Sequence, residues 1–420
     1  MGHRRSATFL VTVVLAVACG SETSPVGRWS HSVEQIGDTT IVRTGAVDDS
    51  QALLAVREVL RIGMAEGPDE YIFGRITHVV PGRQEGLYVW DRGTAELREF
   101  DKRGRFVRRI GRVGSGPGEY RFGAGLTSTS GRVVLWDGGN GRVNVYDSSG
   151  AFLDSWQYSG SIARLEMVSD TAGNVYVPES INGHDALVSV RLTDGVGLDT
   201  LIAPVLGPQP SPLRAISPDG GTMIQRSVPF APRPIVVFHP HGFFVGGVGD
   251  QYRVRLFRPG GELRIERQSN PIAVSHSKRE ELENMLTAGL RRTNPAWRWD
   301  GPKIPDERPF FVDLHTASDG TIWVRRSVAP EDQLFTKGFQ YTGEREEPDA
   351  FDVYALDGTF CGHVVLPANV RVLHLGGRTL WATLEDELGV PYLVQFEVGR
   401  EPRRPELANG GTSLHCAGYR

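Results

Sequence analysis

The sequence of 420 residues has little cysteine and no excess of charge of one sign. Its three cysteines are Cys19, Cys361 and Cys416, which is too few for a disulfide-rich scaffold. The formal net charge is −4 with both signs interspersed, which argues against the basic surface of a nucleic-acid-binding protein. The apolar segment at residues 7–18 is shorter than the roughly 20 residues of a membrane-spanning helix.

Glycine is plentiful, with 51 residues, and 26 prolines are scattered along the chain. This composition suits many short strands joined by tight turns better than it suits a bundle of helices. We therefore predict an all-β fold, and a chain of this length calls for a search for internal repeats before it is divided into domains.

The N-terminal segment is typical of an export signal. Arg4 and Arg5 precede the apolar residues 7–18, and Cys19 follows small residues and leads into a polar stretch. This pattern resembles the bacterial lipoprotein signal, which implies cleavage before Cys19 and acylation of that residue. We expect a signal peptide at 1–18, a tether at 19–27 and a membrane-anchored protein on the periplasmic or cell-surface side of the envelope. The alternative is an ordinary secretory signal in which Cys19 is incidental.

Two segments of the chain repeat the same motif. Both read Arg-Ile-Gly, a short linker, then Gly-Pro-x-Glu-Tyr-x-Phe-Gly, and Glu70 and Glu119 occupy the same place in them. The following Trp90 and Trp136 are also equivalent, each in an apolar run that ends in aspartate. A period of roughly 40 to 50 residues with four strand signals per unit is typical of β-propeller blades. The recurrent tryptophans indicate packing between blades.

Weaker copies of the unit bring the count to six, with seven as the alternative if residues 25–50 hold more structure. The last copy lacks an outer strand, and residues 57–62 could supply it, which would close the ring. We therefore predict a six-bladed β-propeller over residues 28–400, closed by an N-terminal strand. Residues 270–309 form an insertion with a helix near 275–292, and 401–420 form a C-terminal tail.

Residues 111–152 resemble an NHL-type repeat, and the chain after the signal is similar to bacterial lipoproteins described as six-bladed β-propellers. The resemblance implies the fold, but that family is defined by its fold and carries no established reaction. We therefore favour an envelope-anchored module that binds or scaffolds a protein or small-molecule ligand, acts as a monomer, and has no cofactor and no catalytic residue.

Four histidines support an alternative function. They lie in or just after the predicted innermost strands of four blades, and they are His78, His239, His315 and His374. Some NHL-type lyases hold a catalytic metal in the channel with histidines from several blades. Converging imidazoles could bind zinc, or the channel could hold calcium, in a metal-dependent lyase or lactonase. A strand of period two gives each histidine only an even chance of facing the channel.

Three further features have two interpretations each. Trp297, Arg298 and Trp299 are either a recognition patch or part of a small core within the insertion. Cys361 and Cys416 either form a disulfide in an oxidising envelope or stay unpaired. Glu70 and Glu119 are either cation ligands or acceptors of backbone N–H groups in their own turns.

Overall fold

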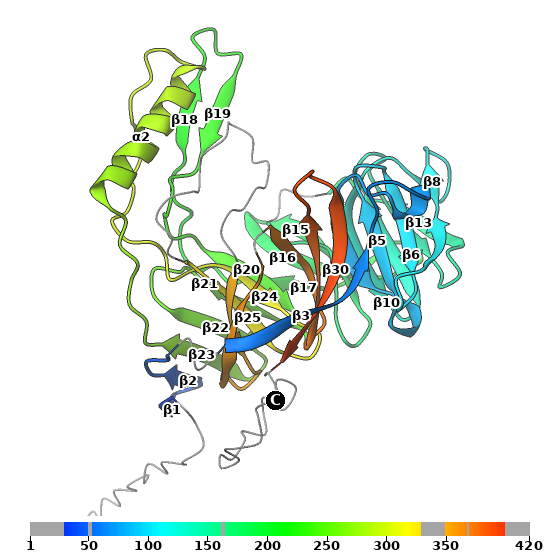
Figure 1. Cartoon of the computed structure of the whole chain (residues 1–420), viewed down its shortest axis with the longest axis horizontal. Helices are drawn as coiled ribbons and strands as arrows, with labels where there is room; N and C mark the ends of the chain where they lie inside the picture. Colours follow the sequence, from blue (N-terminus) through cyan, green and yellow to red (C-terminus); the bar gives the residue numbers. More distant parts are fainter. Residues whose placement is uncertain (1–28, 49–52, 161–163, 329–348, 368, 400–420) are drawn as a thin grey trace, which may run out of the picture.

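The computed structural model describes residues 29–48, 53–160, 164–328, 349–367 and 369–399 (Figure 1). Within them the chain is mostly strand, with one α-helix. No helix in this part of the chain is long and apolar enough to cross a membrane. The predicted signal peptide 1–18, the tether 19–27, Cys19, Cys416 and the tail 401–420 lie outside the described residues.

The described strands form six blades of four antiparallel strands around a central axis, which confirms the predicted six-bladed β-propeller. The first three blades, from the innermost strand outward, are β4 (Ile76–Pro81), β5 (Leu87–Asp91), β6 (Glu96–Phe100) and β7 (Phe106–Ile110); β10 (Gly123–Thr129), β11 (Arg132–Asp137), β12 (Arg142–Tyr146) and β13 (Phe152–Gln157); and β14 (Val168–Ser169), β15 (Val175–Ile181), β16 (His184–Val190) and β17 (Gly197–Ile202).

The last three blades follow the same order from the inside outward. They are β20 (Ile235–His239), β21 (Phe243–Gly247), β22 (Arg253–Arg258) and β23 (Gly261–Arg267); β24 (Phe311–Thr316), β25 (Ile322–Arg326), β26 (Ala350–Tyr354) and β27 (Phe360–Val365); and β28 (Val370–Leu375), β29 (Thr379–Glu385), β30 (Pro391–Gly399) and β3 (Leu53–Ile62). The remaining elements are β1 (His31–Ile36), β2 (Thr39–Thr44), β8 (Arg112–Val113), β9 (Glu119–Tyr120), β18 (Leu213–Ile216), β19 (Met223–Arg226), α2 (His276–Arg291) and the 3₁₀ turns η1 (Asp69–Tyr71) and η2 (Arg83–Glu85).

An N-terminal strand closes the ring, as predicted. β3 pairs antiparallel with β30, from Ala55 opposite Gly399 to Ile62 opposite Leu393, and so becomes the fourth strand of the sixth blade. The start of β3 also pairs parallel with β27 of the fifth blade, through Leu53 and Leu54. One strand therefore joins two blades and satisfies backbone groups that an open sheet edge would expose.

The segment before β3 adds a hairpin, and the hairpin does not make a seventh blade. β1 pairs with β2, and β2 runs parallel to β23 at the outer edge of the fourth blade. Every residue of β1 is exposed. Residues 25–50 thus contain structure, but that structure widens an existing blade.

The recurrent tryptophans pack between blades, as their repetition predicted. Trp90, Trp136, Trp323 and Trp381 each join an apolar cluster shared with the following blade of the ring. The Trp90 ring, for example, meets Tyr120 edge to face, with ring centroids 5.1 Å apart. The two sheet faces of a blade are therefore its contact surfaces with its neighbours.

The insertion is larger than predicted. The helix α2 begins after Ser275, whose side chain accepts a hydrogen bond from the backbone N–H of Lys278, and it ends before Pro295 as expected. It packs on the β18–β19 hairpin, which lies between the third and fourth blades in the sequence and was not predicted. We call β18, β19, α2 and residues 293–304 the insertion lobe; Figure 1 shows it standing away from the ring of blades.

Candidate functional site

The four candidate histidines lie in innermost strands, but they do not form a shared site. His78 is in β4, His239 in β20, His315 in β24 and His374 in β28. Among the described residues, no three His, Cys, Asp or Glu side chains come together in a way that could hold a metal ion. The structure therefore does not support the predicted convergence of these histidines on the channel.

The reason is the direction of the side chains. His315 lies directly opposite Trp323 across two strands, and His374 lies opposite Trp381. Residues directly opposite each other share a sheet face, so these histidines point along the faces that meet the neighbouring blades. His78 likewise pairs with Trp90. Burial lowers the pKa of His374 to about 4, and burial together with Arg371 does the same for His78.

His239 is a structural residue at the joint between the fourth and fifth blades. Its ring is fully buried and stacks on Phe243, with centroids 4.3 Å apart. Its Nε2 lies 3.2 Å from the carbonyl oxygen of Gly320, and its Nδ1 accepts the backbone N–H of His241 at 3.1 Å. Both ring nitrogens are thus occupied, and burial lowers the pKa of His239 to about 4.

We take as the candidate site a cluster of charged and polar side chains in the fifth blade. We call it the His315 cluster, and it consists of His315, Asp313, Arg325 and Asp349. Asp313 lies 3.7 Å from His315 Nε2 and 3.5 Å from the Arg325 guanidinium, which also contacts Asp349 at 3.1 Å. Burial lowers the pKa of His315, although Asp313 acts in the opposite direction. The imidazole is therefore neutral at pH 7 and can both donate and accept a hydrogen bond.

The His315 cluster lies on two adjacent strands, β24 and β25, and on Asp349 immediately before the third strand, β26. His315 and Asp313 are each about one third exposed, so a ligand can reach them. Sequence reasoning found His315 but missed its three partners. The only signals for them were Asp313 two residues before the histidine in one strand and Arg325 two residues after Trp323 in the next.

The tryptophans of the insertion form its core and not an exposed patch. Trp297 is only 6% exposed, packs among apolar residues of α2 and β18, and donates its indole N–H to the Arg214 carbonyl at 2.7 Å. Trp299 is half-buried beside it, while Arg298 is exposed. The recognition-patch interpretation was therefore wrong for Trp297, because the β18–β19 hairpin covers it.

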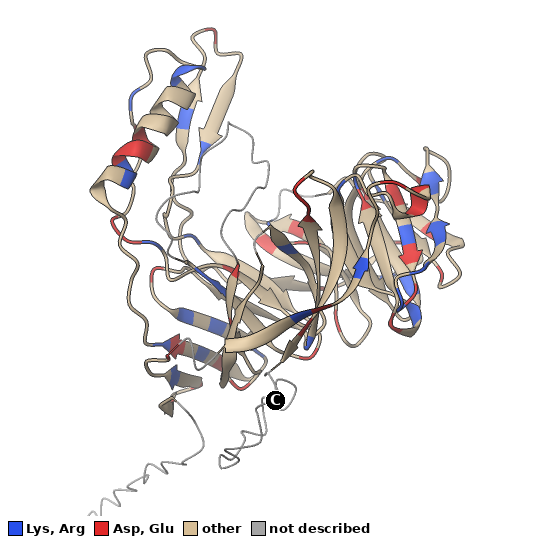
Figure 2. Ribbon diagram, viewed as in Figure 1, with Lys and Arg blue, Asp and Glu red and all other residues tan. Residues whose placement is uncertain are grey.

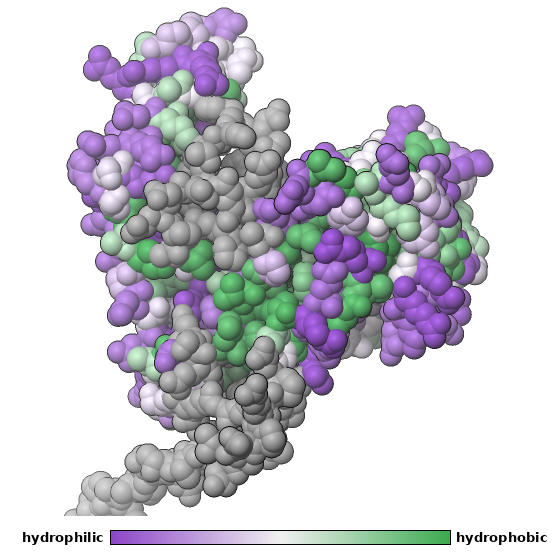
Figure 3. Space-filling view, viewed as in Figure 1, coloured by the Kyte–Doolittle hydropathy of each residue, from purple (hydrophilic) through white to green (hydrophobic). Residues whose placement is uncertain are grey.

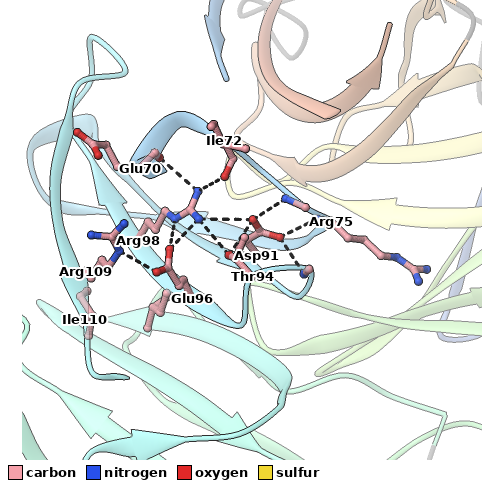
Figure 4. A network of polar contacts seen from close by, with 12 residues as sticks. Glu70, Ile72, Arg75, Asp91, Thr94, Glu96, Arg98, Arg109 and Ile110 are labelled. Carbon is pink, nitrogen blue, oxygen red and sulfur yellow. Dashed lines mark hydrogen bonds and ion pairs between the residues drawn. The ribbon is translucent and has the colours of Figure 1, made fainter. Parts of the chain in front are cut away.

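Of the two equivalent glutamates, Glu119 has the local role that the repeat predicted. Glu119 accepts the backbone N–H of Gly116 at 2.7 Å and pairs with Arg112 at 2.7 Å, and these contacts lower its pKa. Glu70 contributes its main-chain carbonyl to a network around Arg98, a buried guanidinium that also binds the Ile72 carbonyl at 2.9 Å (Figure 4).

Arg98 holds the loop that contains Glu70 and Ile72 against the first blade. Its side chain is 1% exposed and contacts Glu96 at 2.7 Å and the Thr94 hydroxyl at 3.0 Å. Asp91 lies next to it and accepts the backbone N–H groups of Gly74 and Arg75 (Figure 4). Sequence reasoning did not single out Arg98, and its contacts are structural, because they connect a strand to the Gly-Pro-x-Glu-Tyr loop.

Cys361 is buried and disulfide-bonded. Its partner lies outside the described residues, so the pairing with Cys416 stays a prediction.

Comparison with known proteins supports the fold. Residues 50–161 match a family described as a six-bladed β-propeller. The match spans the first two blades, which are the blades that carry the clearest repeat, and it confirms the resemblance to bacterial six-bladed propellers. No curated protein matches the chain.

Several solved propeller structures are similar to this propeller. A protein of Bacteroides fragilis is 11% identical, with a TM-score of 0.48 over 86% of this chain and 100% of the other. A DUF4221-family member from Bacteroides vulgatus is 9% identical, with a TM-score of 0.44 over 84% and 100%. Virginiamycin B lyase from Staphylococcus aureus is 7% identical, with a TM-score of 0.40 over 82% and 99%.

Proposed function

We propose that this propeller is an envelope-anchored binding module that uses the insertion lobe to recognise its ligand. The observation that carries the proposal is an exposed apolar pair at the tip of the lobe. Ile216 ends β18 and Met223 begins β19; they lie opposite each other and are 50% and 58% exposed. Exposed apolar residues on a rigid projecting element are typical of recognition surfaces.

The rigidity of the lobe comes from its own core. Leu213 and Ala215 of β18 pack against Leu282, Leu286 and Leu290 of α2, and all five are buried. The ring closes through β3 without the lobe. The face of the lobe that is visible in Figure 3 is mostly hydrophilic. A module with its own core that the ring does not need for closure has a role other than holding the propeller together.

Anchoring in the envelope is part of the proposal. It is supported by the signal-like residues 4–18, by Cys19 at their end, and by the disulfide at Cys361, because disulfides persist in oxidising compartments outside the cytoplasm. Two or more acyl chains would anchor the protein stably.

The metal-dependent lyase or lactonase is the weaker candidate. It needs histidines that converge, whereas His239 has both ring nitrogens in use and His374 lies against the next blade. Elemental analysis of the chain purified without chelator tests it. Near-stoichiometric zinc, iron or calcium that is lost in His239→Ala and His315→Ala variants would overturn our preference for a binding module.

Binding by the lobe is tested with the immobilised chain and an envelope extract. The double variant Ile216→Ser/Met223→Ser removes the apolar pair, and Val33→Ser is the matched control because Val33 is 60% exposed on β1, far from the lobe. We expect quantitative mass spectrometry to show a component, protein or small molecule, that the native chain and the control retain and the double variant loses. Identical retained sets for all three chains would contradict the proposal.

A further inference from the structure

A hollow on the first blade is lined by cations and is separate from the insertion lobe and from the His315 cluster. It has a volume of about 670 Å³ and is bounded by η2, the end of β6, the β6–β7 turn and β7. That volume lies within the range of about 300–1,000 Å³ that is usual for small-ligand sites. Its cationic side chains are Arg83, Lys102, Arg103, Arg105 and Arg108.

Three of these cations already have acidic partners. Lys102 pairs with Glu85 at 3.1 Å, Arg105 with Asp101 at 2.8 Å, and Arg108 with Glu99 at 2.9 Å.

The other two cations, Arg83 and Arg103, make no ion pair within the described part of the chain. Arg83 donates to the carbonyl of Ser148 at 3.1 Å, which orients its guanidinium without neutralising it. The hollow therefore carries an excess of two positive charges, although the whole chain is acidic overall. Figure 2 shows basic residues on the strands of this side of the ring, among acidic ones.

The propeller repeat does not require these cations. In the second blade the equivalent turn keeps Asp147 and Gly150, which correspond to Asp101 and Gly104 and form the turn itself. The positions equivalent to Lys102, Arg103, Arg105 and Arg108 are Ser148, Ser149, Ala151 and Asp154. The residues that form the turn are thus the same in both blades, and of these two blades only the first has cations around the turn.

One wall of the hollow also has an unusual backbone. Gln84 and Glu85 in η2 both adopt left-handed conformations, with φ of 48° and 64°. Consecutive non-glycine residues in this region are uncommon and strained, and such strain concentrates where a loop is shaped for a ligand. The lining also includes Val107, which is 42% exposed and can contact an apolar part of a ligand.

From this arrangement we propose that the hollow binds a phosphorylated ligand, whose phosphate is held by Arg83 and Arg103. A phosphate monoester carries a charge of about −1.5 to −2 at pH 7, which matches the two uncompensated cations. Guanidinium groups bind phosphate oxygens with paired hydrogen bonds. The phosphate belongs either to a free metabolite or to the headgroup of a membrane lipid.

Calorimetry in low-salt chloride buffer tests the proposal on the chain without residues 1–19, a truncation that removes no described residue. The free probe is glycerol 3-phosphate. We expect saturable binding that weakens at least tenfold in Arg103→Ala and in Arg83→Ala. Arg103→Lys should recover part of it, because lysine restores the charge but not the paired geometry.

The matched control is Arg191→Ala. Arg191 lies in the equivalent turn of the third blade, is exposed, and pairs with Asp194 at 2.8 Å. Binding should be unchanged in this variant, and circular dichroism should show that all variants are folded. Equal weakening by Arg191→Ala and Arg103→Ala would overturn the proposal, because it would reflect charge in general and no specific site.

Vesicles distinguish the two sources of phosphate. Vesicles of phosphatidylcholine with phosphatidic acid, whose headgroup is a phosphate monoester, and of phosphatidylcholine alone, are sedimented with each chain. Arg103-dependent binding of glycerol 3-phosphate identifies a free ligand. Arg103-dependent sedimentation with the anionic vesicles but not with the neutral ones, in the absence of glycerol 3-phosphate binding, identifies a lipid headgroup. The absence of saturable, Arg103-dependent binding to both probes would overturn the proposal.

Discussion

Nδ1 of His363 lies 3.2 Å from Oδ1 of Asp352, in a largely buried group that joins the fourth and fifth blades. From the fifth blade, Arg326 contacts the same carboxylate at 3.4 Å. From the fourth blade, Tyr252 and Arg267 both donate to its other oxygen. Five polar side chains would be costly to bury singly, and together they satisfy one another.

This group makes the free energy of unfolding depend on pH in the acidic range. Burial alone would raise the pKa of Asp352, but His363, Arg267 and Arg326 lower it to about 2. A carboxylate with a depressed folded-state pKa stabilises the fold above its unfolded pKa of about 4, and this contribution is lost as the pH falls towards 2. We expect Asp352→Asn to be less stable than the native chain at pH 7, with a gap that narrows by about 2 kcal/mol between pH 5 and pH 2. Urea unfolding across this range measures the gap, and a constant gap would contradict the prediction.

The packing of Trp90 gives a second prediction. A Cβ atom at Gly123 would lie 2.4 Å from the Trp90 indole, which is too close for the ring to stay in place. Gly123→Ala should therefore destabilise the first blade interface by about 1–3 kcal/mol through overpacking. Gly399→Ala is the control, because nothing lies within 4 Å of its Cβ position. If the melting temperature of Gly399→Ala were lower than that of Gly123→Ala, the indole would not be tightly held and the prediction would be wrong.

Closure by β3 gives a third prediction. Val56→Pro removes a backbone donor from the strand that completes the sixth blade, where Val56 lies opposite Val398. We expect a loss of about 3 kcal/mol or more and a lower urea midpoint. Val33→Pro in β1, an exposed edge strand outside the ring, should cost much less. If both variants lost the same stability, β3 would not be the closing strand in solution.

The disulfide gives a fourth prediction. Cys361 is disulfide-bonded, and the sequence offers only Cys19 and Cys416 as partners within the chain. Acylation of Cys19 would require the bond to go to Cys416. Peptide mapping without reductant should yield one linked peptide that contains Cys361 and Cys416, together with an acylated Cys19. A link between Cys361 and Cys19 would rule out the lipoprotein hypothesis.

Sequence reasoning reached the fold because the evidence for it is local and repeated. Trp90 and Trp136, or Asp101 and Asp147, recur with the same spacing and the same chemistry, so the blades could be counted, and the unit without an outer strand pointed to residues 57–62. The β18–β19 hairpin was not predicted because its strands have only four residues each. Their burial also depends on residues of α2 that lie more than 50 positions further along the chain.

The candidate sites were harder to predict because they depend on side-chain direction. Strand position placed His315 correctly at the inner edge, but whether it met His374 depended on which sheet face each residue occupied. The cationic hollow is lined by both Arg83 and Arg103, and Gln84 next to Arg83 has a left-handed backbone conformation. The residue types in this turn do not predict that conformation.

The hairpin on the fourth blade determines how a pull on the N-terminus is transmitted. β2 lies along β23 in parallel over six residue pairs, from Thr39 beside Glu262 to Thr44 beside Arg267. The chain reaches this ladder before it reaches β3. If the protein is tethered as we propose, a pull on the N-terminus reaches the β1–β2 hairpin and then the β2–β23 ladder before it reaches β3, and the strand that holds the ring shut is shielded from mechanical load.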